Sequence, residues 1–157
     1  MMPIVIPAVL RARIYDHARR CFPAECCGYL RGAPDAVDEL VECRNAHADG
    51  DHPTTPDRGE ESAFVIAGAE LIAFARSFDS SSPARVVYHS HTNGRAYFSA
   101  VDRDVATATG GPTYPVQHLV VGLTGTTIVE AAQFAWDDAS RDWIEVARWP
   151  VDPEVAR

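Results

Sequence analysis

The chain has no cluster of basic residues, although 14 of its 157 residues are basic. Its 22 acidic residues outnumber them, give a formal net charge of −8, and are spread along the sequence. Because binding to nucleic acid needs Lys and Arg side chains gathered on one surface, this composition argues against a nucleic-acid-binding role.

Three further absences narrow the class of protein. The first ten residues lack a basic segment followed by an apolar one, which a secretory signal would show. No apolar run approaches the length of a membrane span. The four cysteines lack the spacing of a disulfide framework, since three of them lie within residues 21–27. We therefore expect a cytoplasmic protein with free thiols and no membrane partner.

What the sequence does contain is a mixture of helical and strand patterns over residues 1–157, which predicts a single domain with its core at about 7–149. Helices are predicted at 7–21, 67–78 and 99–109, and the buried side of the second is predicted to carry Leu71, Ile72, Phe74 and Ala75. Strands are predicted at 26–30, 37–43, 62–66, 85–88, 116–123, 126–136 and 143–149. The order favours an α/β or α+β fold with one central sheet.

A long polar segment interrupts this pattern at residues 45–61. It contains two glycines, two prolines and two histidines, His47 and His52. We expect a loop that is mobile or involved in binding. A solvated polar loop explains its histidines better than a second metal site does.

Two histidines, His89 and His91, stand one residue apart at the end of a predicted strand. Side chains at i and i+2 of a strand share a face, so both imidazoles would point the same way. Asp102, in the first turn of the next predicted helix, is the nearest third ligand. Two histidines and one carboxylate would leave a fourth zinc position open, as in catalytic sites.

Simpler explanations exist for the same residues. Most isolated His-x-His pairs are ordinary surface or core histidines. Ser99 and Asp102 also have the spacing of a helix capping box, in which each side chain bonds the other's backbone amide. Ser99 could cap the helix and still point its hydroxyl into a site.

A zinc hydrolase also needs a carboxylate to accept a proton from the attacking water. Glu25, just before the strand predicted at 26–30, is the candidate. Nothing in its local spacing shows that it reaches the histidines, and an exposed glutamate is the usual alternative.

The chain resembles the JAMM (MPN+) metalloprotease family in two motifs, which read PAECCG at residues 23–28 and HSH followed by SAVD at residues 89–102. The resemblance extends over most of residues 7–135. It implies a JAB/MPN domain, with a curved mixed sheet flanked by helices and the broad plan of cytidine deaminase.

The same resemblance implies one Zn²⁺ per chain, bound by His89, His91 and Asp102. Glu25 would be the general base, which activates water and later protonates the leaving amine. Ser99 would donate a hydrogen bond to the oxyanion of the reacting carbonyl. Members without turnover lack one or more of these residues, and this chain has all five.

The stretch around His91 looks like small bacterial members of the family, because Thr92 stands where eukaryotic deubiquitinases usually have proline. Those members act on ubiquitin-like sulfur-carrier proteins. The implied reaction is hydrolysis of the amide after the carrier's C-terminal Gly-Gly, releasing cysteine or a short peptide, in cysteine biosynthesis or a natural-product pathway. Two alternatives remain open: an isopeptidase acting on lysine, and a carrier-binding module without turnover. A homodimer is also open, since small relatives often dimerise.

Overall fold

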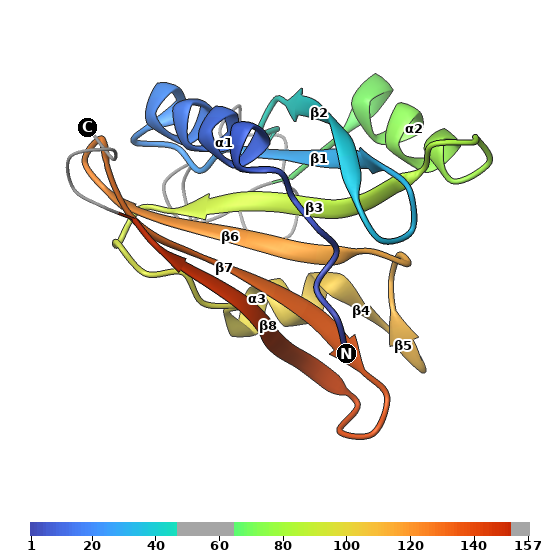
Figure 1. The fold of residues 1–157 in the computed structure, drawn as a ribbon. Helices are drawn as coiled ribbons and strands as arrows, with labels where there is room; N and C mark the ends of the chain where they lie inside the picture. The colour runs from blue at the N-terminus through green and yellow to red at the C-terminus, as the bar shows by residue number, and fades with distance from the viewer. Residues whose placement is uncertain (47–64, 152–157) are drawn as a thin grey trace.

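The computed structural model describes residues 1–46 and 65–151 as three helices and eight strands (Figure 1). Most of the polar segment at 45–61, with His47 and His52, lies outside the described residues. The elements in chain order are α1 (Ala8–Cys21), β1 (Cys27–Gly32), β2 (Val37–Cys43), α2 (Gly68–Ser77), β3 (Ala84–His91), α3 (Ala100–Ala106), β4 (Thr107–Ala108), β5 (Gly111–Pro112), β6 (Gln117–Thr124), β7 (Thr127–Asp137) and β8 (Asp142–Pro150). No helix among the described residues is long and apolar enough to cross a membrane.

Six strands form one mixed sheet in the order β2-β1-β3-β6-β7-β8. Every neighbouring pair is antiparallel except β3 and β6, which are parallel. A parallel pair needs a crossover connection, and the segment that contains α3 provides it. The remaining two strands, β4 and β5, form a small separate ribbon after α3. The mixed, curved sheet agrees with the predicted fold class.

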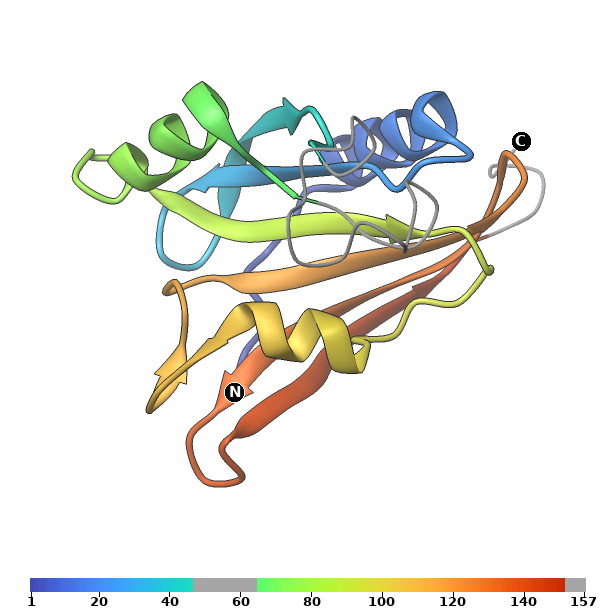
Figure 2. The same cartoon turned by 180° about the vertical axis from the view of Figure 1, so that it is seen from behind.

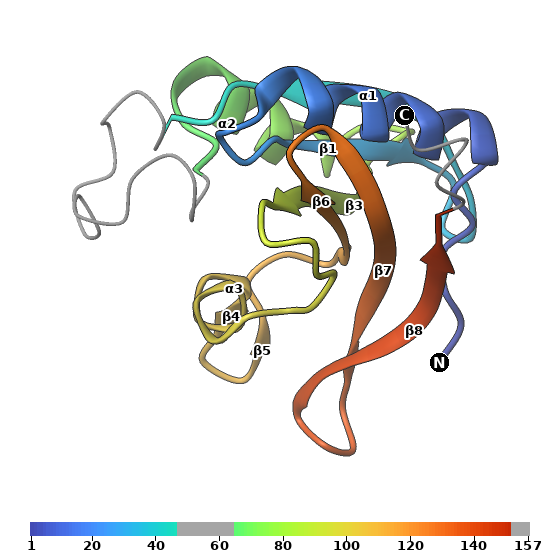
Figure 3. The same cartoon turned by 90° about the vertical axis from the view of Figure 1, so that its left-hand side faces the viewer.

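The first face of the sheet is covered by α1, as seen along the sheet in Figure 3. Its apolar positions recur at helical spacing, and Leu10, Ile14 and Ala18 are buried. They share a core cluster with Val86 and Tyr88 of β3. Alternate residues of β3 therefore point toward α1, and the residues between them point to the opposite face.

The opposite face is covered by α2 and α3, which lie along β3 and β6 in Figure 2. Phe74 of α2 packs in a cluster with Val87 of β3. Ala106 of α3 packs with Val120 of β6 and Trp143 of β8. The amino end of α3 lies beside the carboxyl end of β3 (Figure 2), so the two histidines and the aspartate meet on this face.

Two predicted boundaries are wrong, and one predicted strand is wrong over the residues that the structure describes. The strand predicted at 85–88 continues to His91, because the pairing with β1 and β6 extends through both histidines. The helix predicted at 99–109 ends at Ala106, where the chain turns into the β4–β5 ribbon. Of the strand predicted at 62–66, residues 65 and 66 are not in a strand, and the rest lies outside the described residues.

Candidate metal centre

His89 and His91 lie at the carboxyl end of β3 and point to the α2–α3 face. The strand continues through both residues, so the i, i+2 alternation predicted from the sequence holds. Both are buried, and their Nε2 atoms are 3.1 Å apart. Two imidazole nitrogens thus converge on one point at the end of the central strand.

Asp102 brings a carboxylate oxygen to the same point. Its Oδ2 lies 3.1 Å from His89 Nε2 and 3.2 Å from His91 Nε2. Zinc–ligand distances of about 2.0–2.1 Å in a tetrahedron separate two ligand atoms by roughly 3.3 Å. Spacings of this size are those expected around one small cation, so the three residues fit a metal ion.

The position of Asp102 follows from the start of α3. Ser99 is the N-cap, and its Oγ accepts a hydrogen bond from the Asp102 backbone amide at 3.0 Å. In return, the Ser99 amide donates to Asp102 Oδ2 at 2.9 Å. The capping box considered from the sequence therefore forms, and it aims the carboxylate at the histidines. Since Ser99 Oγ accepts from the helix, its hydroxyl proton is available to a group in the site.

Glu25 reaches the cluster through the pairing of β1 with β3. Cys27 stands opposite His89 in this antiparallel ladder, so continuing the register two residues back places Glu25 opposite His91. Glu25 is only 4% exposed, which excludes the surface glutamate considered above. One ligand atom from each of Glu25, His89 and His91 lies within 4.8 Å of the others, close enough to hold a metal ion.

The charges at the centre hold Asp102 as a carboxylate, favour a neutral His91 and favour a protonated His89. Burial raises the pKa of Asp102, but His89 and His91 outweigh it and hold that pKa well below its usual range. Burial lowers the pKa of His91, which favours the neutral imidazole. Burial opposes a charge on His89 as well, but Asp102 overrides this effect and raises the pKa. Metal binding would displace a proton from such a pair.

Two residues that the sequence reasoning missed hold Glu25 in place. Asn45 Nδ2 donates to the Glu25 carbonyl at 3.0 Å. Ser90, between the two histidines, points to the other face of β3, and its Oγ accepts from the Cys26 amide at 2.8 Å. The place of Ser90 within the motif could have signalled its role, whereas nothing local signals Asn45.

An apolar pocket of about 330 Å³ lies on the α2–α3 face, on the side of the centre toward the amino end of β3. Val87, two residues before His89 and on the same side of β3, lines it, as do Leu71 of α2 and Val105 of α3. Both Leu71 and Val105 are exposed, at 38% and 63%. Leu71 and its neighbour Ile72 were predicted to lie on the buried side of this helix, which is wrong because only the Phe74 side of α2 meets the sheet.

The buried thiols near the centre are not nucleophiles. Burial raises the pKa of Cys26 and Cys27 far above the ordinary value and that of Cys43 to about 12. Nucleophilic cysteines instead have lowered pKa values. Cys27 is instead a small core side chain, because it is completely buried.

With this geometry in hand, comparison with known proteins identifies the family. A family model described as prokaryotic homologs of the JAB domain matches residues 7–143. The chain belongs to this family. Two structures resemble this JAB-domain protein in fold: a Desulfitobacterium hafniense protein (TM-score 0.63, 20% identical, covering 89% of this chain and 87% of that one) and a JAB1/MPN domain protein from Archaeoglobus fulgidus (TM-score 0.51, 16% identical, covering 93% and 96%).

Among curated proteins, the JAB-domain chain is 31% identical over 106 residues to proteins named CysO-cysteine peptidase from Mycobacterium tuberculosis and Mycobacterium bovis. The match covers 66% of this chain and 66%, just under two thirds, of those relatives. Membership of the JAB family, a relative named as a peptidase and a buried cluster that could hold a metal ion together support a hydrolase of the JAMM peptidase type.

Proposed function

We propose that this protein is a zinc-dependent peptidase that hydrolyses the amide bond after the C-terminal Gly-Gly of a ubiquitin-like sulfur-carrier protein. The released group would be an amino acid such as cysteine, or a short peptide. The observation that carries the proposal is that two carboxylates, those of Glu25 and Asp102, each lie close to the buried imidazoles of His89 and His91. The similarity to the CysO-cysteine peptidases supports the choice of substrate.

In this proposal His89, His91 and Asp102 hold the metal, because their ligand atoms have the spacing of one coordination shell. Glu25 is left as the base, because Asp102 already supplies the third ligand and the Glu25 carboxylate lies within 4.8 Å of the ligand atoms of both histidines. A zinc ion held there would polarise the scissile carbonyl and lower the pKa of a bound water toward about 7.

The protein's own groups would then move the protons. Glu25 would accept one from the attacking water and pass it to the leaving amine, a role worth typically 10²–10⁴ in rate. Ser99 would donate a hydrogen bond from its hydroxyl to the oxyanion that develops on the carbonyl; loss of one such donor costs about 10²–10³ in rate. The fixed α3 start and the Asn45 and Ser90 contacts keep both groups in position.

The carrier's tail would lie along the α2–α3 face of β3. Strand residues advance about 3.3 Å each, so Val87 at the pocket edge lies roughly 7 Å from His89 along the strand. Two glycines in extended form span a similar length. The Gly-Gly would thus fill the narrow approach to the metal, and an apolar side chain before it would enter the pocket lined by Val87, Leu71 and Val105.

The test is intact-mass spectrometry of a bacterial sulfur carrier ending in Gly-Gly-Cys, incubated with the zinc-loaded protein. A loss of mass that leaves a Gly-Gly end, and that a chelator prevents, is the expected result. Cleavage only of a lysine-linked carrier would favour the isopeptidase instead. Zinc and carrier binding with no cleavage of either substrate would favour the binding module without turnover.

A further inference from the structure

The two sides of the metal centre differ in charge. Among the residues that the structure describes, the pocket on the Val87 side is lined by apolar side chains, Thr113, Tyr114 and His118, and by no arginine. On the other side, beyond His91, the loop into α3 carries Arg95. Building on the proposed function, we propose that Arg95 binds the free C-terminal carboxylate of the released residue or dipeptide, so that the protein trims carrier C-termini rather than lysine-linked conjugates.

Arg95 stands beside the metal centre through an aromatic contact. The ring of Tyr97 lies against the imidazole of His91, with ring centroids 4.6 Å apart. Arg95 Cζ lies 5.4 Å from the centre of the Tyr97 ring. The Tyr97 ring therefore lies between the guanidinium and a proposed metal ligand. A cation over an aromatic face is attracted to the ring.

The backbone that carries Arg95 is packed tightly against β6. Gly94 has a φ of 80°, a conformation that suits glycine, and its amide donates to the Leu123 carbonyl at 2.9 Å. Gly122 of β6 lies so close to this loop that a Cβ built there would be 2.6 Å from the Arg95 carbonyl carbon. Two glycines thus allow the loop to lie against the sheet, and this packing fixes the backbone position of Arg95.

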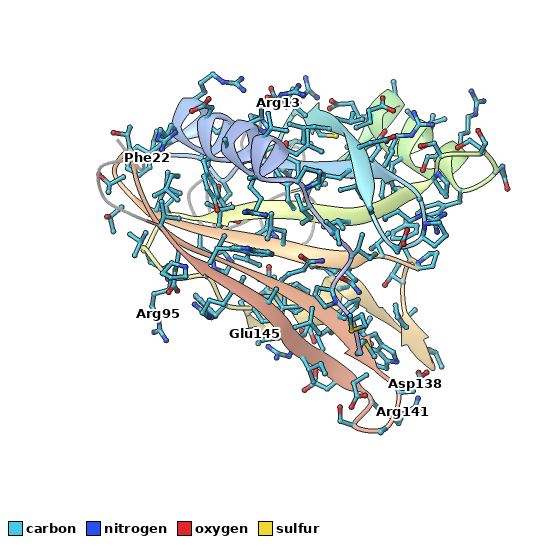
Figure 4. All side chains as sticks on the ribbon, viewed as in Figure 1. Arg13, Phe22, Arg95, Asp138, Arg141 and Glu145 are labelled. Carbon is cyan, nitrogen blue, oxygen red and sulfur yellow. The ribbon has the colours of Figure 1, made fainter. Side chains whose placement is uncertain are left out.

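The next residue, Ala96, is held from both of its backbone groups. Its amide donates to Glu130 Oε2 at 2.8 Å, and its carbonyl accepts from the Arg148 guanidinium at 2.9 Å. Arg148 and Glu130 are themselves paired at 2.8 Å. The loop is therefore preorganised by β7 and β8, while the Arg95 side chain points away from the ribbon into solvent (Figure 4).

Arg95 also differs from the nearby arginines in its charge balance. Arg103 pairs with Asp142, and Arg148 pairs with Glu130 and Glu145. Arg95 forms no ion pair with any residue in the parts of the chain that the structure describes, although it lies near enough to Glu130 to help lower the pKa of that carboxyl. A guanidinium without an ion-pair partner is suited to a carboxylate, which it can bind through two parallel hydrogen bonds.

The reach of the side chain suits a short leaving group. Each residue after the scissile bond adds about 3.5 Å, so the terminal carboxylate of one or two residues lies within roughly 4–8 Å of the cleaved amide. Arg95 starts four residues beyond His91, on a loop that folds back against it. A lysine isopeptide presents an alkyl chain there and no terminal carboxylate, so it would gain nothing from this cation.

The experiment uses the zinc-loaded full chain and a bacterial sulfur carrier extended after Gly-Gly by one cysteine, made by semisynthesis with either a free carboxylate or a carboxamide end. The wild-type protein should cleave the carboxylate form with a kcat/KM about 10-fold to 100-fold higher than the carboxamide form. Most of this difference should lie in KM, since the binding free energy of a hydrogen bond to a charged group corresponds to a ratio of this size. Arg95→Gln should abolish the difference without lowering cleavage of the carboxamide form. Arg95→Lys, which keeps the charge but loses the planar fork, should retain part of it.

Arg13→Gln is the matched control, because Arg13 is an exposed arginine on the far side of α1 (Figure 4); it should keep the full preference. Equal cleavage of the two forms by the wild type, or a preference that survives Arg95→Gln, would overturn the inference while leaving the peptidase intact. Better cleavage of a lysine-linked carrier than of the carboxylate form would also overturn it. Failure to cleave any form would remove the proposed function itself, and with it the role of Arg95.

Discussion

Replacement of Glu25 by glutamine separates the two ways in which the carboxylates at the metal centre can be assigned. Glu25, His89 and His91 lie within 4.8 Å of one another, while Asp102 Oδ2 lies 3.1–3.2 Å from the same two histidines. Either carboxylate could therefore complete a three-residue metal site. We assign Asp102 as the ligand and Glu25 as the base, and the two assignments predict opposite results for Glu25→Gln.

The expected magnitude follows from what surrounds Glu25. Its backbone is fixed by Asn45, and the next residue by Ser90, so a glutamine of the same shape should occupy the same place. Only the proton acceptor is lost. Turnover should fall by about 10²–10⁴, which corresponds to roughly 3–5 kcal/mol of transition-state stabilisation. Zinc content should stay at one ion per chain.

Asp102→Asn is the paired variant. Asparagine can still accept the hydrogen bond from the Ser99 amide, so the start of α3 should survive and the fold should be nearly as stable. The charge that balances the metal is lost, so zinc content should fall well below one ion per chain after dialysis. Turnover should fall with it.

The assays are metal analysis of dialysed protein and intact-mass measurement of carrier cleavage, made on both variants. Loss of zinc from Glu25→Gln together with zinc retained by Asp102→Asn would refute our assignment and make Asp102 a capping residue only. Turnover by zinc-loaded Glu25→Gln near the wild-type rate would show that another group is the base.

Three further predictions concern the fold around the centre. Gly28→Ala should lower the free energy of unfolding by about 1–3 kcal/mol, because a Cβ there would lie 2.4 Å from the Val41 carbonyl oxygen. The control is Gly111→Ala, whose added Cβ meets open space. Equal losses for the two variants in urea denaturation would contradict the packing argument. Burial lowers the pKa of His118 to about 3, below its unfolded value near 6.5. As the pH falls, the unfolded chain therefore takes up the proton before the folded protein does. The free energy of unfolding should fall by up to about 1.4 kcal/mol per pH unit between about pH 6.5 and pH 3. His118→Phe should therefore lose less stability between pH 7 and pH 5 than the wild type, and parallel losses would count against this cause. A thiol reagent at pH 8 should reach at most Cys21 in the folded protein and all four cysteines in denaturant; native reaction of the other three would refute their burial.

Local sequence patterns predicted the helices and strands that depend on neighbouring residues. The helix at Ala8–Cys21 follows from apolar residues at helical spacing. The capping of α3 by Ser99 and Asp102 follows from side chains only three residues apart. Local patterns failed at α2, where Leu71 and Ile72 looked like core residues but are exposed. Periodicity shows that a helix has an apolar side, but how much of that side is covered depends on its neighbours.

The sequence by itself determined that His89 and His91 share a face, because strand side chains alternate whatever the partner strands are. It also brought Asp102 into the first turn of the next helix. Only the tertiary structure decided that Glu25 joins them, since the register of β1 on β3 connects residues more than sixty positions apart. Only it placed Asn45 and the Arg95 loop around the site. Short-range geometry is fixed by covalent bonds and local sterics, whereas long-range pairing is fixed by which strands bury their faces together.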